Sequence, residues 1–385
     1  MLKLGIIGFG HRIRGMVSHL GEYGIPFTLT AVADPAIDAE RVRSDPLLAD
    51  ATLYTDADSM LSSETLDGVM VGTRCMLHTE MACKVAPYKL PLFLEKPVAI
   101  SFGQLTTLRD AFDGYQAPTV VSFPLRMSPI VQRVKELIQA DTIGTVEQVI
   151  AVNDVPYGGV YYYRWYRDYA YAGGLWLQKA THDLDYIAHL LGQRPARLAA
   201  MMAQRVYGGD RPFDLRCADC ADVETCPESP FNLFYQRFQG EQVEPHEQRM
   251  CLFSEGIRNQ DMGSCLLAYE NGAQASYTQN FFARKQAARR GARLYGYKGT
   301  IDFDWYANTI KVYYHQRPDV DTIDFSGSMS HFGGDRELIL DWLRAMRDGS
   351  PSRSPMSAGI ESALTCLWAR ESAESGRFCD IVWPD

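Results

Sequence analysis

The sequence predicts an α/β chain of two domains: an N-terminal doubly wound domain, then a C-terminal α+β domain with an open, largely antiparallel sheet. Up to residue 123, short apolar runs alternate with helix-like segments, which is typical of a parallel sheet covered on both faces. Longer strand-like runs with few helices follow. A glycine turn also joins the first strand to the first helix. We therefore divide the chain into residues 1–123 and 124–385.

Composition excludes several classes of protein. Of the 385 residues, 46% are hydrophobic and 22% are charged, so the chain can bury a large core and is not disordered. The net charge is −9, without a long basic run, so we expect no nucleic-acid partner. No apolar run reaches the roughly 18 residues that span a bilayer, and no secretory leader opens the sequence. We expect a cytoplasmic protein with no membrane partner.

The first domain is expected to contain five parallel strands. Apolar runs indicate strands at 2–7, 27–33, 66–71, 90–94 and 117–123. In the second domain, Ser128 as N-cap and Pro129 at the first helical position predict a helix over 128–140. Strands are expected at 146–155, 196–203, 264–269, 273–282, 292–297 and 309–314, and helices at 334–347 and 358–375.

The turn after the first strand has the features of a dinucleotide site. Gly8 suits the tight turn, and Gly10 lets the backbone approach a pyrophosphate at the helix N-terminus. Ile13 stands where the usual fingerprint has its third glycine. Two glycines can also form an ordinary turn. The predicted cofactor-binding residues of this turn are Gly8, Phe9, Gly10, His11, Arg12 and Ile13.

Asp34 ends the second predicted strand, where a carboxylate accepts hydrogen bonds from a ribose diol. The same carboxylate repels a 2′-phosphate, which favours NAD over NADP. Arg12 and Arg14 could offset that repulsion, so NADP is the alternative. Asp34 could also simply cap the next helix.

Further motifs occur in a characteristic order. Glu95-Lys96-Pro97 follows the predicted strand at 90–94, a strand and loop cover 69–78, and a glycine pair opens the segment 173–185. Later landmarks lie at 297–301 and 331–335. This ordered set resembles the Gfo/Idh/MocA oxidoreductases. The resemblance implies a Rossmann domain that binds NAD(P), with Thr73, His78, Glu95 and Lys96 also near the cofactor.

The resemblance also implies the catalytic residues. Lys96 would hold the substrate hydroxyl and stabilise a developing alkoxide. His182 would act as the general base, because a histidine exchanges protons near neutral pH. Gln178 stands four residues before His182, where the family pattern has Asp, so Lys179 becomes a possible contributor. Asp185 is placed to orient the His182 ring. The non-catalytic alternatives are that Lys96 lies at a solvated strand end and that His182 is purely structural.

Residues 154–167 gather aromatic and arginine side chains just before this segment. Aromatic faces with hydrogen-bonding groups suit a polyol or sugar, and they suit an oligomer contact equally well. The predicted substrate-binding residues are Lys96, Tyr157, Arg164, Trp165, Lys179 and His182.

Residues 207–260 are read as a polar, cysteine-rich insertion. Cys217, Cys220, Cys226 and Cys251 are predicted to hold a structural zinc, with His246 as the alternative to Cys251. Disulfide pairs or free thiols are the competing interpretations.

The leading functional prediction is an NAD-dependent oxidoreductase that transfers a hydride between the nicotinamide and a secondary alcohol of a sugar, sugar derivative or cyclitol. The alternatives are an NAD-dependent glycosidase with transient oxidation and a non-catalytic dinucleotide-binding regulatory protein. We also expect a homo-oligomer, either a dimer or a tetramer.

Overall fold

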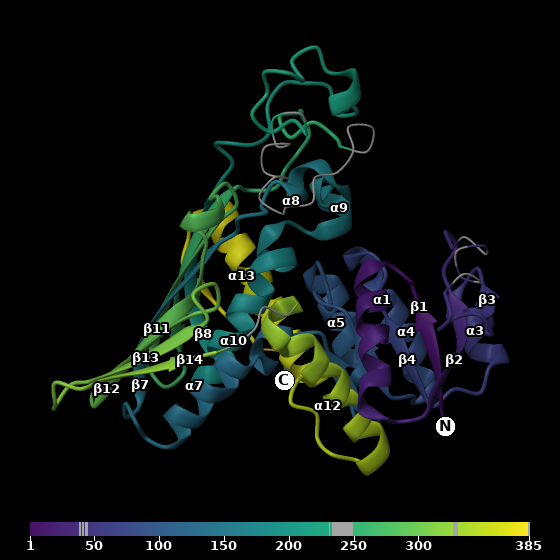
Figure 1. The fold of residues 1–385 in the computed structure, drawn as a ribbon, viewed down its shortest axis with the longest axis horizontal. Coiled ribbons are helices and arrows are strands. Elements are labelled where there is room, and N and C mark those ends of the chain that lie inside the picture. The colour runs from purple at the N-terminus through teal and green to yellow at the C-terminus, as the bar shows by residue number, and fades with distance from the viewer. Residues whose placement is uncertain are drawn as a thin grey trace.

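The computed structural model describes the chain except residues 38, 39, 41, 43, 44, 231, 233–248, 326–329 and 384–385, and it leaves out the side chains of Lys285, Ser330 and His331. Two sheets organise the described residues (Figure 1). The first sheet has six strands and the second has nine. The predicted α/β class with a parallel and a largely antiparallel sheet is confirmed.

The first sheet is parallel throughout. Its strands, in spatial order, are β3 (Thr52–Tyr54), β2 (Phe27–Ala33), β1 (Leu2–Ile7), β4 (Gly68–Val71), β5 (Leu92–Leu94) and β6 (Thr119–Val121). Strand β2 has the predicted bounds. Strand β3 was not predicted, because its three residues are partly exposed and form no apolar run.

Alternate strand residues face different helices. Leu4, Ile6 and Phe93 lie in one apolar cluster with α1 (His11–Leu20) and α12 (Gly334–Asp348). Their neighbours Ile7, Val71 and Leu94 lie in another cluster. That cluster includes residues of α3 (Ala57–Ser63), α4 (His78–Val85) and α5 (Phe102–Phe112). Helices therefore cover both faces of the sheet, as a doubly wound fold requires.

The second sheet is mixed. In spatial order its strands are β14 (Val320–Asp324), β13 (Thr309–Tyr314), β12 (Gly299–Asp304), β11 (Arg289–Gly296), β7 (Val146–Asp154), β10 (Gln274–Asn280), β9 (Met262–Tyr269), β8 (Pro195–Ala203) and β15 (Cys379–Asp380). Only the β7–β10 pair among them is parallel. Strands β12, β14 and β15 were not predicted. Charged residues interrupt the apolar pattern of β12, and β14 is largely exposed.

The remaining helices are α6 (Pro124–Met127), α7 (Pro129–Gln139), α8 (Val160–Tyr163), α9 (Tyr169–Ala172), α10 (Thr181–Leu191) and α13 (Met356–Ser375). Of these, α6 and α7 connect the two sheets, and the others connect strands of the second sheet. Helix α7 begins as predicted, with the Ser128 hydroxyl accepting from the Val131 N–H. Helices α10 and α13 pack on the second sheet and bring segment 173–185 against the end of β5.

Helix α12 belongs to the second half of the chain but packs on the first sheet, beside α1 (Figure 1). Its Trp342 is fully buried, and its ring lies 5.9 Å from that of Phe93. The first apolar core therefore includes a helix from beyond residue 123.

The cysteine-rich segment forms the extension at the top of Figure 1, where residues 207–230 and 249–260 are largely irregular. Isolated bridges join Arg211 to Ser254 and Arg216 to Met250. No helix in the described part of the chain has the length and apolar character that crossing a membrane requires.

Candidate active site

A cavity of about 550 Å³ opens at the carboxyl end of the first sheet, around the glycine turn. Gly8 has φ 81°, and a Cβ there would lie 2.8 Å from the Thr73 backbone nitrogen. Gly10 precedes α1, and no side chain caps that helix. The amides of the first helical turn can therefore receive a pyrophosphate. These features fit a dinucleotide.

Asp34 lines the same cavity. Its carboxylate accepts hydrogen bonds from the Phe9 N–H at 2.9 Å and from the Ala36 N–H at 3.0 Å. These two amides fix the carboxylate beside the turn, and further lone pairs can accept from ribose hydroxyls. Asp34 thus both organises the local backbone and faces the cavity.

The two arginines of the turn are engaged elsewhere. Arg12 donates to Glu95 at 2.9 Å and, through two nitrogens, to Asp335 at 2.7 and 2.6 Å. Arg14 pairs with Asp45 at 3.1 Å. Arg12 therefore ties the glycine turn to β5 and α12. The sequence suggested that Arg12 could offset repulsion of a 2′-phosphate. In the structure its guanidinium is instead committed to Glu95 and Asp335. Glu95, which the resemblance places near the cofactor, is likewise engaged by Arg12.

His78 joins the loop after β4 to the turn after β5. Its ring nitrogens lie 2.8 Å from the Pro97 carbonyl oxygen and 3.1 Å from the Thr73 carbonyl oxygen. The ring is buried, so His78 positions the loop that carries Thr73. Thr73 itself lines the cavity.

Lys96 lies directly after β5, where doubly wound sheets place their ligands. Its ammonium donates to the Gln178 carbonyl oxygen and to the Gln178 side-chain oxygen, each at 2.7 Å. Burial lowers the pKa of Lys96 to about 8, against the opposing effects of Cys75 and Glu95. Lys179 lowers it further. Both partner oxygens are neutral, so no direct ion pair restores the ordinary value.

The segment after Gly173 and Gly174 begins with a helical turn that is wider than a turn of α-helix. At Trp176–Ala180 the chain forms a π-helical turn, in which the Thr181 N–H donates to the Trp176 carbonyl oxygen. The wider turn buries Gln178 and Lys179 together, although neighbours on an α-helix point about 100° apart. His182, one turn on, is also buried, with its ring edge-on to Phe123 at 6.3 Å.

Asp185 does not have the predicted contact. It forms a buried, two-point ion pair with Arg126, including an Nε–Oδ2 distance of 2.9 Å. Helix α6 brings Arg126 to this position from 59 residues away. The carboxylate is therefore committed to Arg126 rather than to the His182 ring.

Tyr157, in the turn after β7, contacts Lys179. The Lys179 ammonium donates to the Tyr157 hydroxyl at 2.6 Å. Gly158 fixes this turn, since a Cβ there would lie 1.9 Å from the Phe281 carbonyl oxygen. The structure thus brings together Lys96, Gln178, Lys179 and Tyr157, all predicted site residues.

Sequence reasoning missed the charged group next to this pair. Asp183 accepts from Arg290 at 2.9 and 3.0 Å, from Asn153 at 2.8 Å and from Tyr277 at 3.0 Å, all in the interior. Arg290 is 107 residues away in sequence, so no local motif could reveal the pair.

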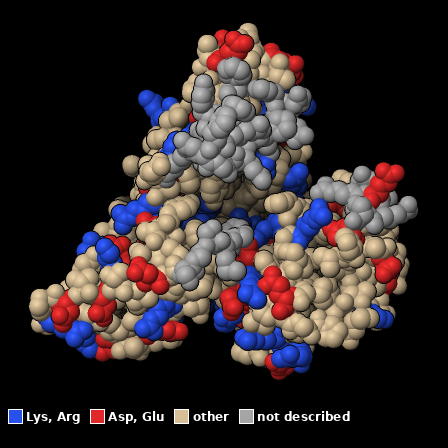
Figure 2. Space-filling model, in the orientation of Figure 1, with Lys and Arg blue, Asp and Glu red and all other residues tan. Residues whose placement is uncertain are grey.

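The other predicted substrate residues, Arg164 and Trp165, lie in the segment between helices α8 and α9. Arg74, from the loop after β4, stacks on Trp165 with its guanidinium 4.1 Å from the ring centroid. Arg164 is exposed, and its guanidinium lies 6.0 Å from the Tyr163 ring. Figure 2 shows Lys and Arg side chains around the hollow at the centre of this face. Their roles toward a substrate remain predictions.

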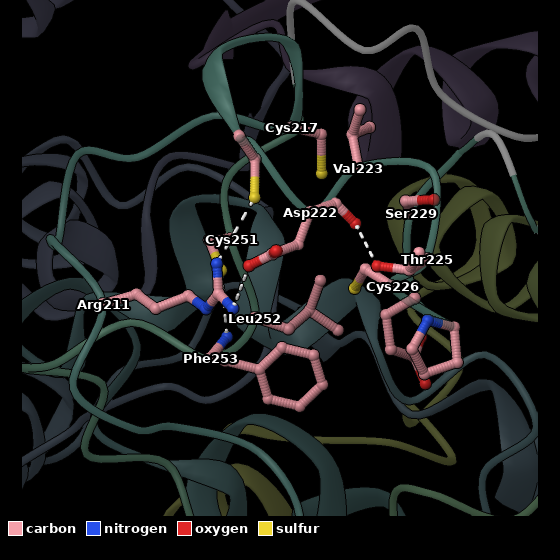
Figure 3. Close-up of a pocket in the computed structure, with 13 residues that line it drawn as sticks. Arg211, Cys217, Asp222, Val223, Thr225, Cys226, Ser229, Cys251, Leu252 and Phe253 are labelled. Carbon is pink, nitrogen blue, oxygen red and sulfur yellow. Dashed lines mark hydrogen bonds and ion pairs between the residues drawn. The ribbon is translucent and has the colours of Figure 1, made fainter.

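The predicted zinc site is not supported. Cys217, Cys220, Cys226 and Cys251 line one cavity of about 390 Å³. Figure 3 shows the labelled Cys217, Cys226 and Cys251 at different sides of it. Over the described residues, no group of three or more His, Cys, Asp or Glu side chains is arranged to hold a metal ion. All four cysteines are free, and burial raises the pKa of Cys217 to about 11. His246 lies outside the described residues.

Comparison with known proteins agrees with this geometry. Residues 2–123 match a family model described as "Oxidoreductase family, NAD-binding Rossmann fold", which defines the class of protein. Residues 131–302 match the GFO/IDH/MocA C-terminal domain. The chain therefore belongs to the Gfo/Idh/MocA oxidoreductase family.

Individual relatives are distant. The oxidoreductase YteT of Bacillus subtilis (strain 168) is 26% identical over 352 residues, or 80% of each chain. Myo-inositol 2-dehydrogenase of Thermotoga maritima is 22% identical over 193 residues, or 50% of this chain and 55% of that one. A levoglucosan dehydrogenase solved with NADH and levoglucosan superposes with a TM-score of 0.76 at 17% identity, covering 99% of each chain. That structural likeness shows the fold.

Proposed function

We propose that this protein is an NAD-dependent dehydrogenase that oxidises a secondary alcohol of a sugar, sugar derivative or cyclitol. The observation that carries the proposal is the position of the Lys96 ammonium, at the carboxyl end of β5 and against Gln178. Family membership and the cavity around the glycine turn support the cofactor. When bound, NAD supplies a hydride acceptor.

Lys96 acts on the reacting hydroxyl in this proposal. An ammonium group stabilises the negative charge that develops on the oxygen as its proton leaves. The two Gln178 oxygens hold the ammonium in place without neutralising it, so its charge is available to the substrate. The sequence predicts His182 as the proton acceptor, and that assignment is untested.

A turnover assay tests the proposal. We would incubate the protein with NAD and a panel of monosaccharides, uronates, anhydrosugars and inositols, and follow NADH absorbance between pH 7 and 9. At least one class should give sustained NADH formation that depends on Lys96, with Lys96→Met as the inactive variant and Lys311→Met, on the exposed side of β13, as the matched control. The absence of NADH with every class would contradict the proposal.

The same assay addresses the two alternatives. A glycosidase that oxidises its substrate transiently would release sugar without accumulating NADH. A regulatory protein would bind NAD with equal affinity in the wild type and in Lys96→Met and turn over nothing.

Self-association is a further part of the proposal. Ile150 and Leu266 are exposed on the outer face of the second sheet, in one row on either side of Ser276. Exposed apolar side chains in the middle of a sheet favour burial against a second copy. Sedimentation equilibrium should give the mass of a dimer or tetramer. The Leu266→Lys variant should form a smaller assembly than the wild type.

A further inference from the structure

We propose that the Tyr157 phenol is the acid–base catalyst of this site, with Lys179 as the positioning residue behind it. The inference rests on the proposed dehydrogenase function. It gives the hydroxyl proton a different destination from His182, the acceptor expected from the sequence.

The first argument is the layered arrangement of the two side chains. Tyr157 is 50% exposed, whereas Lys179 is only 4% exposed. The ammonium lies 2.6 Å from the phenol oxygen and 4.8 Å from the ring centroid. Tyr157 therefore has an exposed side, while the buried cation contacts its phenol oxygen from the interior.

The second argument is the charge around Lys179. A buried ammonium is costly unless an anion or several acceptors compensate it. In the described part of the chain, Lys179 forms no ion pair with a carboxylate, and its hydrogen bond goes to Tyr157. The nearby Asp183 is already occupied by Arg290, Asn153 and Tyr277. Tyr157 in its phenolate form would supply the missing negative charge.

The charged and titratable groups that face the phenol, taken together, favour its phenolate form. They come from several elements: Lys179, Asp183, Arg290, Tyr161 and Tyr306. Partial desolvation of the phenol raises the pKa of Tyr157, but the charges of Lys179 and Arg290 and the Lys179 hydrogen bond outweigh it. The net pKa lies below the ordinary value of a tyrosine. Asp183 opposes this only weakly, because Arg290 neutralises it.

The chemistry balances with the groups named. In oxidation, the phenolate oxygen takes the hydroxyl proton while the hydride leaves the same carbon for the nicotinamide. The O–H and C–H bonds break, the C=O bond forms, and Tyr157 becomes a neutral phenol. In reduction, the phenol returns the proton to the new alkoxide. Lys96 stabilises that oxygen in both directions.

His182 is less accessible than Tyr157. The residue as a whole is 6% exposed, and its ring packs edge-on against Phe123. A buried ring in that position supports helix α10 against the start of α6. This contrast in exposure is why the geometry points to the tyrosine.

Steady-state kinetics give the first test. Tyr157→Phe should lower kcat by roughly 10² to 10⁴, the range for losing an acid–base group, with NAD affinity unchanged. Tyr171→Phe, an exposed tyrosine nearby, is the matched control and should keep full activity. Lys179→Met should shift the acidic limb of the kcat/KM profile upward by about one pH unit or more, because the phenolate loses its cation. A purely structural lysine would leave that limb in place.

The contrary result is equally clear. If Tyr157→Phe keeps near-normal turnover while His182→Ala loses both turnover and the acidic limb, the base is His182 and the inference is wrong.

A second measurement is independent of turnover. 3-Fluorotyrosine incorporated at position 157 should titrate by ¹⁹F NMR at lower pH than the same residue at position 171. Lys179→Met should bring the two midpoints together. Equal midpoints in the parent protein would overturn the Tyr157–Lys179 pair even if the dehydrogenase is active. Lack of NADH formation by the wild type alongside a lowered midpoint would instead refute the proposed function and leave the pair intact.

Discussion

The Lys96 ammonium donates hydrogen bonds to both the backbone carbonyl oxygen and the side-chain oxygen of Gln178, each at 2.7 Å. The family pattern implied by the sequence has a carboxylate at this position. The neutral amide of Gln178 accepts from Lys96 but supplies no counter-charge. Lys96 is therefore held in place with its pKa lowered to about 8, chiefly by burial.

This pKa gives a pH prediction for Lys96. The group is useful as a cation, and it loses its proton as pH rises through about 8. Activity should therefore fall on the alkaline side with a midpoint near pH 8. Lys96→Arg, which stays charged at all accessible pH values, should abolish that fall even if its rate is low. A profile of kcat/KM from pH 6 to 10 measures this, and an alkaline limb that survives in Lys96→Arg would assign it to another group.

Substitutions at the two glycines of the turn should have different effects on the free energy of unfolding and on NAD affinity. A Cβ at Gly10 meets nothing closer than the Gly72 carbonyl oxygen at 3.8 Å, so Gly10→Ala should leave unfolding free energy within about 0.5 kcal/mol. It should nevertheless weaken NAD binding by about tenfold or more, because the methyl group occupies the pyrophosphate approach. Gly8→Ala places a Cβ against the Thr73 backbone at positive φ and should destabilise the fold by about 1–3 kcal/mol.

Denaturant unfolding and fluorescence titration with NAD check both glycine variants. Unchanged NAD affinity in a stable Gly10→Ala protein would move the pyrophosphate away from this turn.

Asp34 should decide the choice between NAD and NADP. Hydrogen bonds to a charged acceptor contribute about 1.5–3 kcal/mol each, so Asp34→Ala should weaken NAD binding by roughly 10- to 100-fold and reduce discrimination against NADP. The exposed Asp110→Ala is the matched control. The two dissociation constants, measured for each protein, test this. Tighter binding of NADP by the wild type would contradict it.

Asp185 should contribute to stability rather than to catalysis. Asp185→Asn removes one partner of the buried pair with Arg126 and leaves a guanidinium uncompensated, which typically costs about 3–5 kcal/mol. Denaturant unfolding measures the loss. An Asp185→Asn protein of normal stability with a shifted acidic limb would instead support the sequence-based role in orienting His182.

Much of the fold could be predicted from local pattern. The apolar run at 27–33 and the Ser128–Pro129 cap were read with correct bounds, because burial and capping leave their signature within a few residues. Short or exposed strands such as β3 and β14 left no such signature. The position of Lys96 after a buried strand was also predictable, since strand ends converge at one edge of a parallel sheet.

What the sequence determined by itself was the two-sheet architecture, the dinucleotide turn and the set of polar residues near one sheet edge. Only the tertiary structure decided which of those residues are partners. Arg12 pairs with Asp335 across 323 residues, Asp185 with Arg126, and Tyr157 with Lys179 through a π-helical turn. Local periodicity reports whether a position is buried, but an ion pair or hydrogen bond depends on the packing of elements that are distant in the chain.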